Sequence, residues 1–201
     1  MKIYLIRHGE TTGDLEDRYG GDYDDHLSTN RLKQVQELGI KLKDKDIQKI
    51  YHSPKIRATE TAKTVSEIIN CPIEKVENIR ERNSYGILTG MIKSEAKQQY
   101  PEEVEKIQKD KLRHSVKNSE DYDSFKKRII QTFENIMLNS DLDSIAIISH
   151  GGPISCFVRE YLKLGELKDL GDCAILEVKN RNDKLELISL SNAKIQSISE
   201  A

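Results

Sequence analysis

The sequence predicts an α/β fold, a three-layer α/β/α sandwich whose sheet is mostly parallel with one antiparallel edge strand. Short apolar segments alternate with longer segments of helical periodicity along the 201 residues. Strands that are separated by helices usually run parallel, with helices covering both faces of the sheet. Near the end of the chain, two strand-like segments follow each other across a turn-rich stretch, which indicates a hairpin.

The predicted parallel strands are short and apolar. Residues 2–6 form the first, and residues 47–52 form the second, which stops at Ser53-Pro54. Proline disfavours helix at the residue before it, so this pair marks a boundary. Residues 72–76 form a short third strand, and residues 144–149 are the strongest strand signal in the chain.

Helices are expected between these strands. Ser28 is suited to cap the first helix. Apolar residues at helical spacing then follow Ser28 up to Leu42. Further apolar stripes run from Ile56 to Ile69 and from Tyr122 to Ile136. A last helix is expected after the fourth strand, ending near Gly165.

The remaining segments complete one domain, residues 1–201. Residues 174–178 and 185–190 are the hairpin strands, joined by a turn at 180–183, so one edge strand is expected to be antiparallel. The polar stretch at about 92–120 lacks a strand signal. We interpret it as a helical insertion that forms a lid over the site. The chain length suits a single core better than two small ones.

Composition excludes several classes of protein. With 36% hydrophobic and 33% charged residues spread along the chain, a disordered protein is excluded. No apolar run approaches the roughly 18 residues that cross a membrane, and no signal-peptide pattern opens the sequence, so a cytoplasmic location is expected. The net charge of −2 argues against a nucleic-acid partner. Cys71, Cys156 and Cys173 have unrelated spacings and indicate neither disulfides nor zinc. No oligomeric state is indicated.

Chemically distinctive residues follow each of the four predicted parallel strands. Arg7-His8-Gly9 follows the first, Arg57 opens the helix after the second, Glu81 lies beyond the third, and His150-Gly151-Gly152 follows the fourth. In open α/β sheets, ligands bind outside the carboxyl ends of the strands. We therefore expect these residues to meet in one site.

The residue types suit phosphoryl transfer. Arginine presents a planar fork of donors to phosphate oxygens and stays charged. The neutral imidazole of His8 has a lone pair that can attack phosphorus, and Gly9 allows the backbone to approach an anion closely. A carboxylic acid is also needed, because an alkoxide leaves poorly unless it is protonated as it departs. His8 is the predicted nucleophile.

Four motifs occur in order: Arg7-His8-Gly9-Glu10-Thr11, Ser53-Pro54 with Arg57, Glu81 with Gly86 and Gly90, and Ser149-His150-Gly151-Gly152. In these motifs the chain resembles the histidine phosphatase superfamily, also called phosphoglycerate mutase-like, over nearly its whole length. Gly-Gly rather than Asp follows the second histidine, so the chain looks more like the mutase branch, branch 1, than the acid-phosphatase and phytase branch.

The resemblance implies roles for the site residues. His8 becomes phosphorylated, while Arg7, Arg57 and His150, together with Gly151, hold the phosphoryl group. Glu81 is then the general acid, and later the base that activates water. No metal ion and no organic cofactor are implied. Glu74 and Glu77 lie near Glu81 in the sequence, which leaves the identity of the acid open.

The expected partner is a small phosphorylated substrate. Contacts to it are expected from five residues: Asp14, Tyr19, Gly20, Asn83 and Tyr85. Asp14 stands where many relatives have asparagine, and its carboxylate would repel an anionic substrate unless it is paired or protonated. The acidic loop from Asp22 to His26 is interpreted as a solvated loop rather than a metal site.

Three functions remain as hypotheses. The preferred one is hydrolysis of a small phosphomonoester through phosphohistidine 8. A phosphoglycerate mutase would use the same intermediate but return the phosphoryl group to a sugar acid, and mutases of this branch tend to be longer than this chain. A catalytically silent phospholigand-binding module is disfavoured, because both histidines, both arginines and a suitable glutamate are present.

Overall fold

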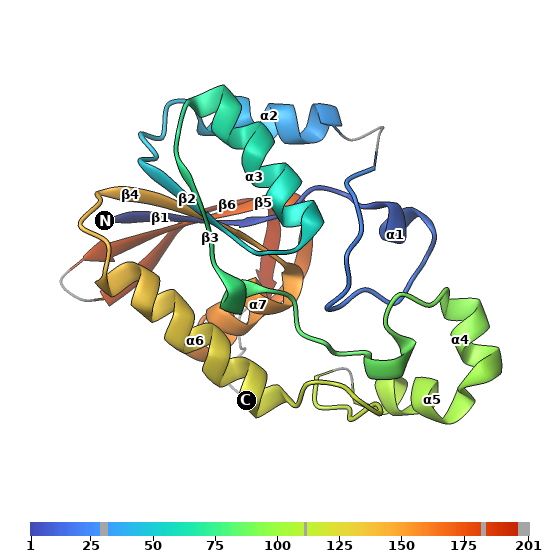
Figure 1. Cartoon of the computed structure of the whole chain (residues 1–201). Coiled ribbons are helices and arrows are strands. Elements are labelled where there is room, and N and C mark those ends of the chain that lie inside the picture. The colour runs from blue at the N-terminus through green and yellow to red at the C-terminus, as the bar shows by residue number, and fades with distance from the viewer. Residues whose placement is uncertain (29–31, 111, 182–183, 197–201) are drawn as a thin grey trace.

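A six-stranded sheet forms the centre of the molecule in the computed structural model, which describes residues 1–28, 32–110, 112–181 and 184–196. The strand order is β3-β2-β4-β1-β5-β6 (Figure 1). The strands are β1 (Lys2–Arg7), β2 (Lys49–His52), β3 (Ile73–Lys75), β4 (Ser144–Ser149), β5 (Glu166–Arg181) and β6 (Lys184–Gln196). All four predicted parallel strands are present, with ends that differ by a few residues at most.

The first four strands of the chain run parallel, which brings their carboxyl ends to one edge of the sheet. β1 pairs with β4, β4 with β2, and β2 with β3. In this register Arg7 lies opposite Ser149, and His52 lies opposite Ile148. The segments that follow these strands therefore leave the sheet at nearly the same level along the strand direction.

The antiparallel hairpin lies at the other side of the sheet. β5 pairs antiparallel with β1 and with β6. Both strands are longer than the apolar segments at 174–178 and 185–190 that predicted them. Register shifts, such as the one between Leu170 and Ile175, interrupt the pairing of β5 with β6 locally. The predicted turn falls partly on residues 182–183, which lie outside the described residues.

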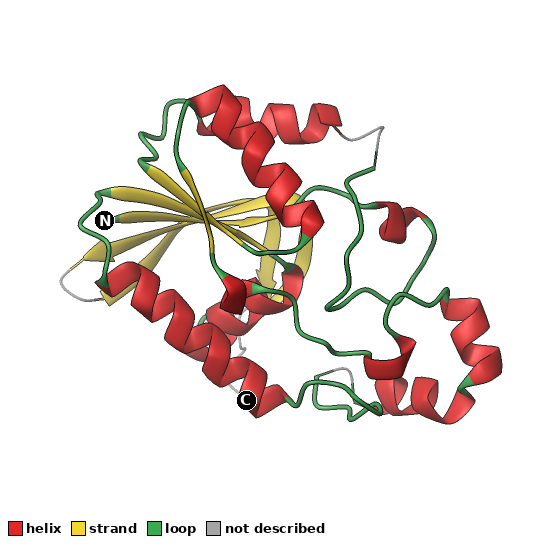
Figure 2. Ribbon diagram, in the orientation of Figure 1, coloured by secondary structure: helices red, strands yellow, loops and turns green. Residues whose placement is uncertain are grey.

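Helices cover both faces of the sheet (Figures 1 and 2), which confirms the predicted three layers. One face carries α2 (Leu32–Leu42) and α3 (Ile56–Ile69); the other carries α6 (Tyr122–Leu138) and α7 (Gly151–Cys156). α7 continues as a π-helical turn over Phe157–Tyr161. The predicted cap at Ser28 cannot be compared with the start of α2, because residues 29–31 lie outside the described part of the chain.

The apolar side chains of β1 alternate between the two faces of the sheet, which explains why helices must cover both faces. Tyr4 and Ile6 pack with α2 and α3, whereas Ile3 and Leu5 pack with α6 and α7, and all four are buried. Successive side chains of a strand point to opposite faces of its sheet. An apolar strand of this kind is stable only with a layer on each side. None of the described helices is long and apolar enough to cross a membrane.

The predicted insertion at about 92–120 is helical between Lys93 and Lys109, and its described residues from 112 on form turns and loop. It contains α4 (Lys93–Gln99) and α5 (Pro101–Lys109), which lie away from the sheet (Figure 1). A small apolar cluster of Tyr19, Leu88, Ala96, Val104 and Val116 holds this part together, separately from the two main clusters. Shorter elements connect it to the rest: α1 (Thr12–Leu15) and 3₁₀ turns at Glu77–Ile79 and Gly86–Leu88. Its role as a lid stays a prediction.

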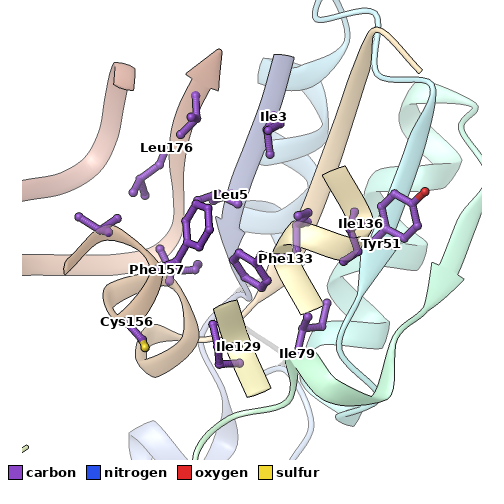
Figure 3. Packing of buried hydrophobic residues seen from close by; sticks show 14 of the residues in the cluster. Ile3, Leu5, Tyr51, Ile79, Ile129, Phe133, Ile136, Cys156, Phe157 and Leu176 are labelled. Carbon is purple, nitrogen blue, oxygen red and sulfur yellow. The ribbon is translucent and has the colours of Figure 1, made fainter. Parts of the chain in front are cut away.

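The packing of α6 yields a stability prediction. Phe133 is fully buried, and its ring centroid lies 4.9 Å from that of Phe157 (Figure 3). Phe133→Ala should lower the free energy of unfolding by about 3–5 kcal/mol, because the apolar contacts are lost and a cavity remains. Urea denaturation followed by circular dichroism measures it.

Leu138 provides the matched control for that variant. It lies at the end of the same helix but is 81% exposed. Leu138→Ala should change the free energy of unfolding by no more than about 0.5 kcal/mol. Equal losses in the two variants would contradict the packing of α6 described above.

Candidate active site

A pocket of about 120 Å³ lies at the carboxyl edge of the parallel strands. The residues that the sequence predicted for the site and that line this pocket are Arg7, His8, Asp14, Gly20, Arg57, Glu81 and Gly151. They come from four separate parts of the chain. The predicted convergence of the strand ends is therefore confirmed as a matter of geometry.

The hydrogen bonds of His8 determine which of its ring nitrogens carries the hydrogen. Its backbone N–H donates to the carbonyl oxygen of Ser149 (3.1 Å), which continues the pairing of β1 with β4. The side-chain Nδ1 lies 2.7 Å from the carbonyl oxygen of Gly9. Because a carbonyl oxygen only accepts, Nδ1 carries the hydrogen and Nε2 carries the lone pair. This is the tautomer that a nucleophile acting through Nε2 needs.

Gly9 is required by close packing. A Cβ at this position would lie 2.8 Å from Cγ2 of Val35 in α2. The Gly9 N–H donates to Oγ1 of Thr61 (3.2 Å), whose hydroxyl donates to the carbonyl oxygen of Arg57 (2.7 Å). The turn after His8 is thus tied to α3. Packing of α2, rather than approach to an anion, explains the glycine in this structure.

The guanidinium of Arg57 lies at the centre of the site and is buried. Its Nε lies 3.2 Å from Nε2 of His8 and 3.2 Å from Nδ1 of His150. Its Nη1 donates to the carbonyl oxygen of Tyr23 (2.7 Å) and to Oδ1 of Asp25 (2.8 Å). Its Nη2 donates to the carbonyl oxygen of Gly21 (3.0 Å). These contacts fix the plane of the guanidinium against both histidine rings.

His150 occupies the N-cap position of α7 and contacts Arg57 next to His8. Its ring centroid lies 5.0 Å from that of His8, at an angle of 62°. Its Nε2 lies 2.7 Å from Oγ of Ser53. Since arginine only donates, Nδ1 of His150 is the acceptor in the contact with Arg57. In the neutral ring the hydrogen is therefore on Nε2, directed at Ser53.

Both histidines are neutral over an extended pH range. Burial lowers the pKa of His8 and of His150 well below the usual histidine range, and the positive charge of Arg57 lowers both further. Arg7 acts in the same direction on His8. A neutral His8 is the form that can attack an electrophile.

Glu81 has the opposite shift. Burial raises its pKa, although hydrogen bonds to the carboxylate and the nearby arginines oppose the change. The Arg82 N–H donates to Oε1 (2.8 Å) and the Gly152 N–H donates to Oε2 (3.1 Å). Glu81 lines the pocket together with His8. A carboxyl group that keeps its proton to higher pH suits a general acid.

Arg7 completes the positive part of the pocket. Its Nη1 donates to the carbonyl oxygen of Leu170 (2.6 Å), and its Nη2 forms an ion pair with Oδ1 of Asp172 (3.1 Å). Both partners belong to β5, the long hairpin strand. The hairpin therefore orients an arginine that the first strand supplies.

Comparison with known proteins agrees with this geometry. The family model described as "Histidine phosphatase superfamily (branch 1)" matches residues 3–193. The chain belongs to this superfamily. The family resemblance seen in the four motifs and the predicted α/β fold are both confirmed.

Individual relatives of this histidine phosphatase include hydrolases and mutases. An uncharacterized phosphatase PhoE of Bacillus subtilis is 27% identical over 158 residues, which are 79% of this chain and 76% of the relative. A 2,3-bisphosphoglycerate-dependent phosphoglycerate mutase of Nitrosococcus oceani is 37% identical over 107 residues, 51% of this chain and 44% of the mutase. The solved alpha-ribazole phosphatase of Shigella flexneri has the same fold, with a TM-score of 0.84 at 20% identity over all of both chains. The predicted phosphatase class is confirmed by the family and its phosphatase relatives.

Asp14 is hydrogen-bonded to uncharged groups of Thr11, which fix its carboxylate without cancelling its negative charge. Its Oδ2 accepts from the backbone N–H of Thr11 (3.0 Å) and from the Thr11 hydroxyl (2.8 Å). Together with the Asp14 N–H bond to Thr11, this forms a capping box at the start of α1. Asp14 is exposed and lines the pocket at the same time.

Three of the predicted substrate contacts lie outside the pocket lining. The rings of Tyr19 and Tyr85 pack against each other with centroids 4.9 Å apart. Asn83 accepts through Oδ1 from the Gly86 N–H (3.0 Å) and the Thr89 hydroxyl (3.1 Å). These side chains shape the link to the insertion. Their role in substrate binding stays a prediction.

The pocket also contains residues that sequence reasoning missed: Thr11, Gly13, Arg18, Gly21, Tyr23 and Asp25. The prediction of a solvated loop is wrong for Asp25, which is 9% exposed and forms an ion pair with Arg57. A run of acidic residues signals a solvated loop in most sequences, and nothing local distinguished Asp25 from its neighbours. No cluster of three or more metal-binding side chains occurs among the described residues.

The close approach of Gly152 to Glu81 yields a prediction. A Cβ at position 152 would lie 2.1 Å from Oε1 of Glu81, so the carboxyl group must move. We expect Gly152→Ala to lower kcat/KM for an alkyl phosphate about 10²-fold, the scale of a lost general acid. Steady-state hydrolysis measures this.

Ser155→Ala in the same short helix is the control, because Ser155 does not line the pocket. It should keep the activity of the unmodified protein. A folded Gly152→Ala variant with unchanged kcat/KM would show that the position of Glu81 is unimportant.

Proposed function

We propose that the protein hydrolyses small phosphomonoesters through a phosphohistidine formed on His8. One observation supports this above all. Nε2 of His8 is unprotonated because Nδ1 donates to Gly9, it faces Nε of Arg57, and His8 lines the same pocket as Glu81, Arg7 and Arg57. A nucleophile, an acid and a phosphate cradle are thus side by side.

In the first step, Nε2 of His8 attacks phosphorus while the bond from phosphorus to the leaving oxygen breaks. Glu81 gives its proton to that oxygen, so the alcohol departs neutral. In the second step water attacks phosphorus, the P–N bond breaks, and the Glu81 carboxylate accepts the proton from water. Arg7 and Arg57 balance the negative charge of the phosphoryl oxygens in both transition states.

The phosphoryl group has to replace an existing contact. In the empty site, Nε of Arg57 is directed at both His8 and His150. His150 can bind a phosphoryl oxygen only with a hydrogen on Nδ1. A nearby phosphate dianion raises the pKa of an imidazole, which favours that protonated form once the substrate is bound.

Hydrolysis is preferred over mutase activity for this chain. The phosphatase relative aligns with about three quarters of both chains, whereas the mutase relative aligns with about half of each. Assays of phosphoglycerate interconversion with and without a bisphosphorylated primer separate the two functions. Turnover that depends on the primer would favour the mutase.

The proposal includes a cytoplasmic location. The free cysteines Cys71, Cys156 and Cys173 support it, because reducing compartments keep thiols unpaired. It also includes a small phosphorylated metabolite as the partner, which the family and its phosphatase relatives support.

Removal of the nucleophile tests the central step. His8→Ala should lower hydrolysis of p-nitrophenyl phosphate by at least about 10³-fold, and the acid-labile phosphohistidine trapped in the unmodified protein should be absent. His26→Ala is the matched control, because His26 is an exposed histidine paired with Glu60. It should keep full activity. Retained hydrolysis in a folded His8→Ala variant would contradict the proposal.

The pH profile tests the two protonation states. Neutral His8 is required, so activity falls as the pH drops through its lowered pKa. Protonated Glu81 is required, so activity falls as the pH rises through its raised pKa. With ordinary pKa values of about 6.5 for histidine and about 4.3 for glutamate, glutamate would lose its proton at a lower pH than the one at which histidine becomes neutral. Both shifts favour the coexistence of neutral His8 and protonated Glu81, and kcat/KM against pH should be bell-shaped.

Glu81→Gln separates the two limbs of that profile. The alkaline limb should disappear, and the loss should be larger for an alkyl phosphate than for p-nitrophenyl phosphate, because nitrophenolate leaves without protonation. Equal losses for the two substrates would assign the acid to another residue.

A further inference from the structure

Each arginine of the cradle is already paired with a carboxylate in the empty site. Arg57 lies 2.8 Å from Asp25, and both side chains are nearly inaccessible, at 5% and 8%. Arg7 lies 3.1 Å from Asp172, with 24% and 22% of the side chains exposed. The positive charge that would attract a phosphate is therefore largely balanced before the phosphate arrives.

Asp25 is held in place from two sides. Its Oδ1 accepts from Nη1 of Arg57, and its Oδ2 accepts from the Tyr23 hydroxyl (3.2 Å). Both Asp25 and Tyr23 line the pocket. The carboxylate is thus a fixed part of the phosphate cradle rather than a mobile surface group.

The contacts of Arg57 divide into two groups. Nη1 and Nη2 donate to the loop that contains Gly21, Tyr23 and Asp25, while Nε faces the two histidines. An incoming phosphoryl group competes for Nε. The bonds through Nη1 can persist during that exchange, so Asp25 keeps the guanidinium in place.

The charge of Asp25 has a second effect. A buried guanidinium without a counter-charge is strongly disfavoured, and a bound phosphate would then be its only partner. With Asp25 present, the phosphate gains less from Arg57 and is repelled by a carboxylate a few ångströms away. In a low-dielectric pocket both effects exceed their size in water.

We infer that Asp25 is a positioning residue that pre-orients Arg57 and weakens the binding of phosphate, so that the product orthophosphate leaves readily. The inference rests on the proposed phosphatase function of this pocket. A purely structural Asp25 would stabilise the loop without changing the affinity for phosphate. The two roles therefore differ in one measurable quantity.

Asp25→Asn is the decisive variant. The amide has the same shape and can still accept from Nη1 of Arg57, but it carries no charge. We expect inorganic phosphate to bind about fivefold to tenfold more tightly by calorimetry. KM for p-nitrophenyl phosphate should fall in parallel, and kcat should not rise. Unchanged or weaker phosphate binding in the folded variant would overturn the inference.

Asp24→Asn is the matched control for the loss of one negative charge. Asp24 is the neighbouring residue, its side chain is 51% exposed, and it accepts from the Ile56 N–H at the start of α3. Its phosphate affinity should stay within about twofold of the unmodified protein, because an exposed charge is screened by solvent. A shift equal to that of Asp25→Asn would mean that net charge alone is responsible, which would also overturn the inference.

Asp172→Asn covers the case in which Asp25→Asn does not fold. The Arg7 ion pair is partly exposed, so we expect a smaller tightening of phosphate binding, about twofold to threefold. Unchanged phosphate binding in Asp172→Asn would then count against charge balancing in the cradle.

Arg57→Ala separates this test from the proposed function. If the unmodified protein binds phosphate no better than Arg57→Ala does, the proposed function fails.

Discussion

The buried guanidinium of Arg57 is the constraint on which the site depends. Its Nε contacts one nitrogen of each of two histidine rings, and the group needs partners for its other hydrogens, because a buried cation without them is strongly destabilising. The loop with Gly21, Tyr23 and Asp25 supplies two carbonyl oxygens and a carboxylate. That loop must therefore fold onto the start of α3, and its residues Gly21, Tyr23 and Asp25 line the pocket beside His8.

The position of Arg57 on α3 raises a question that the structure answers. A cation at a helix N-terminus opposes the helix dipole, so Arg57 needs an anion as its partner. The protein contains its own anion, Asp25, at 2.8 Å. In the same loop, Asp24 accepts the Ile56 N–H at the first residue of the helix. Two neighbouring acids thus compensate the helix start and the arginine separately.

One physical cause, burial at the edge of the sheet, shifts the pKa of the catalytic candidates in opposite directions. It lowers the pKa of His8 and His150 and raises that of Glu81, because in each case the charged form is disfavoured. Burial thereby extends the neutral form of the nucleophile to lower pH and the protonated form of the acid to higher pH. The hydrogen bond from Nδ1 of His8 to Gly9 then directs the lone pair.

The sequence by itself determined the layers of the fold and the residues that follow the parallel strands, because side-chain periodicity and the order of elements along the chain can be read from local segments. His8, Arg57, Glu81 and His150 were found in this way. Only the tertiary structure decided what surrounds them. The burial of Asp25 depends on the path of a loop with no periodicity, and its partner lies 32 residues further along the chain. Contacts between such distant residues are set by packing, which no single segment encodes.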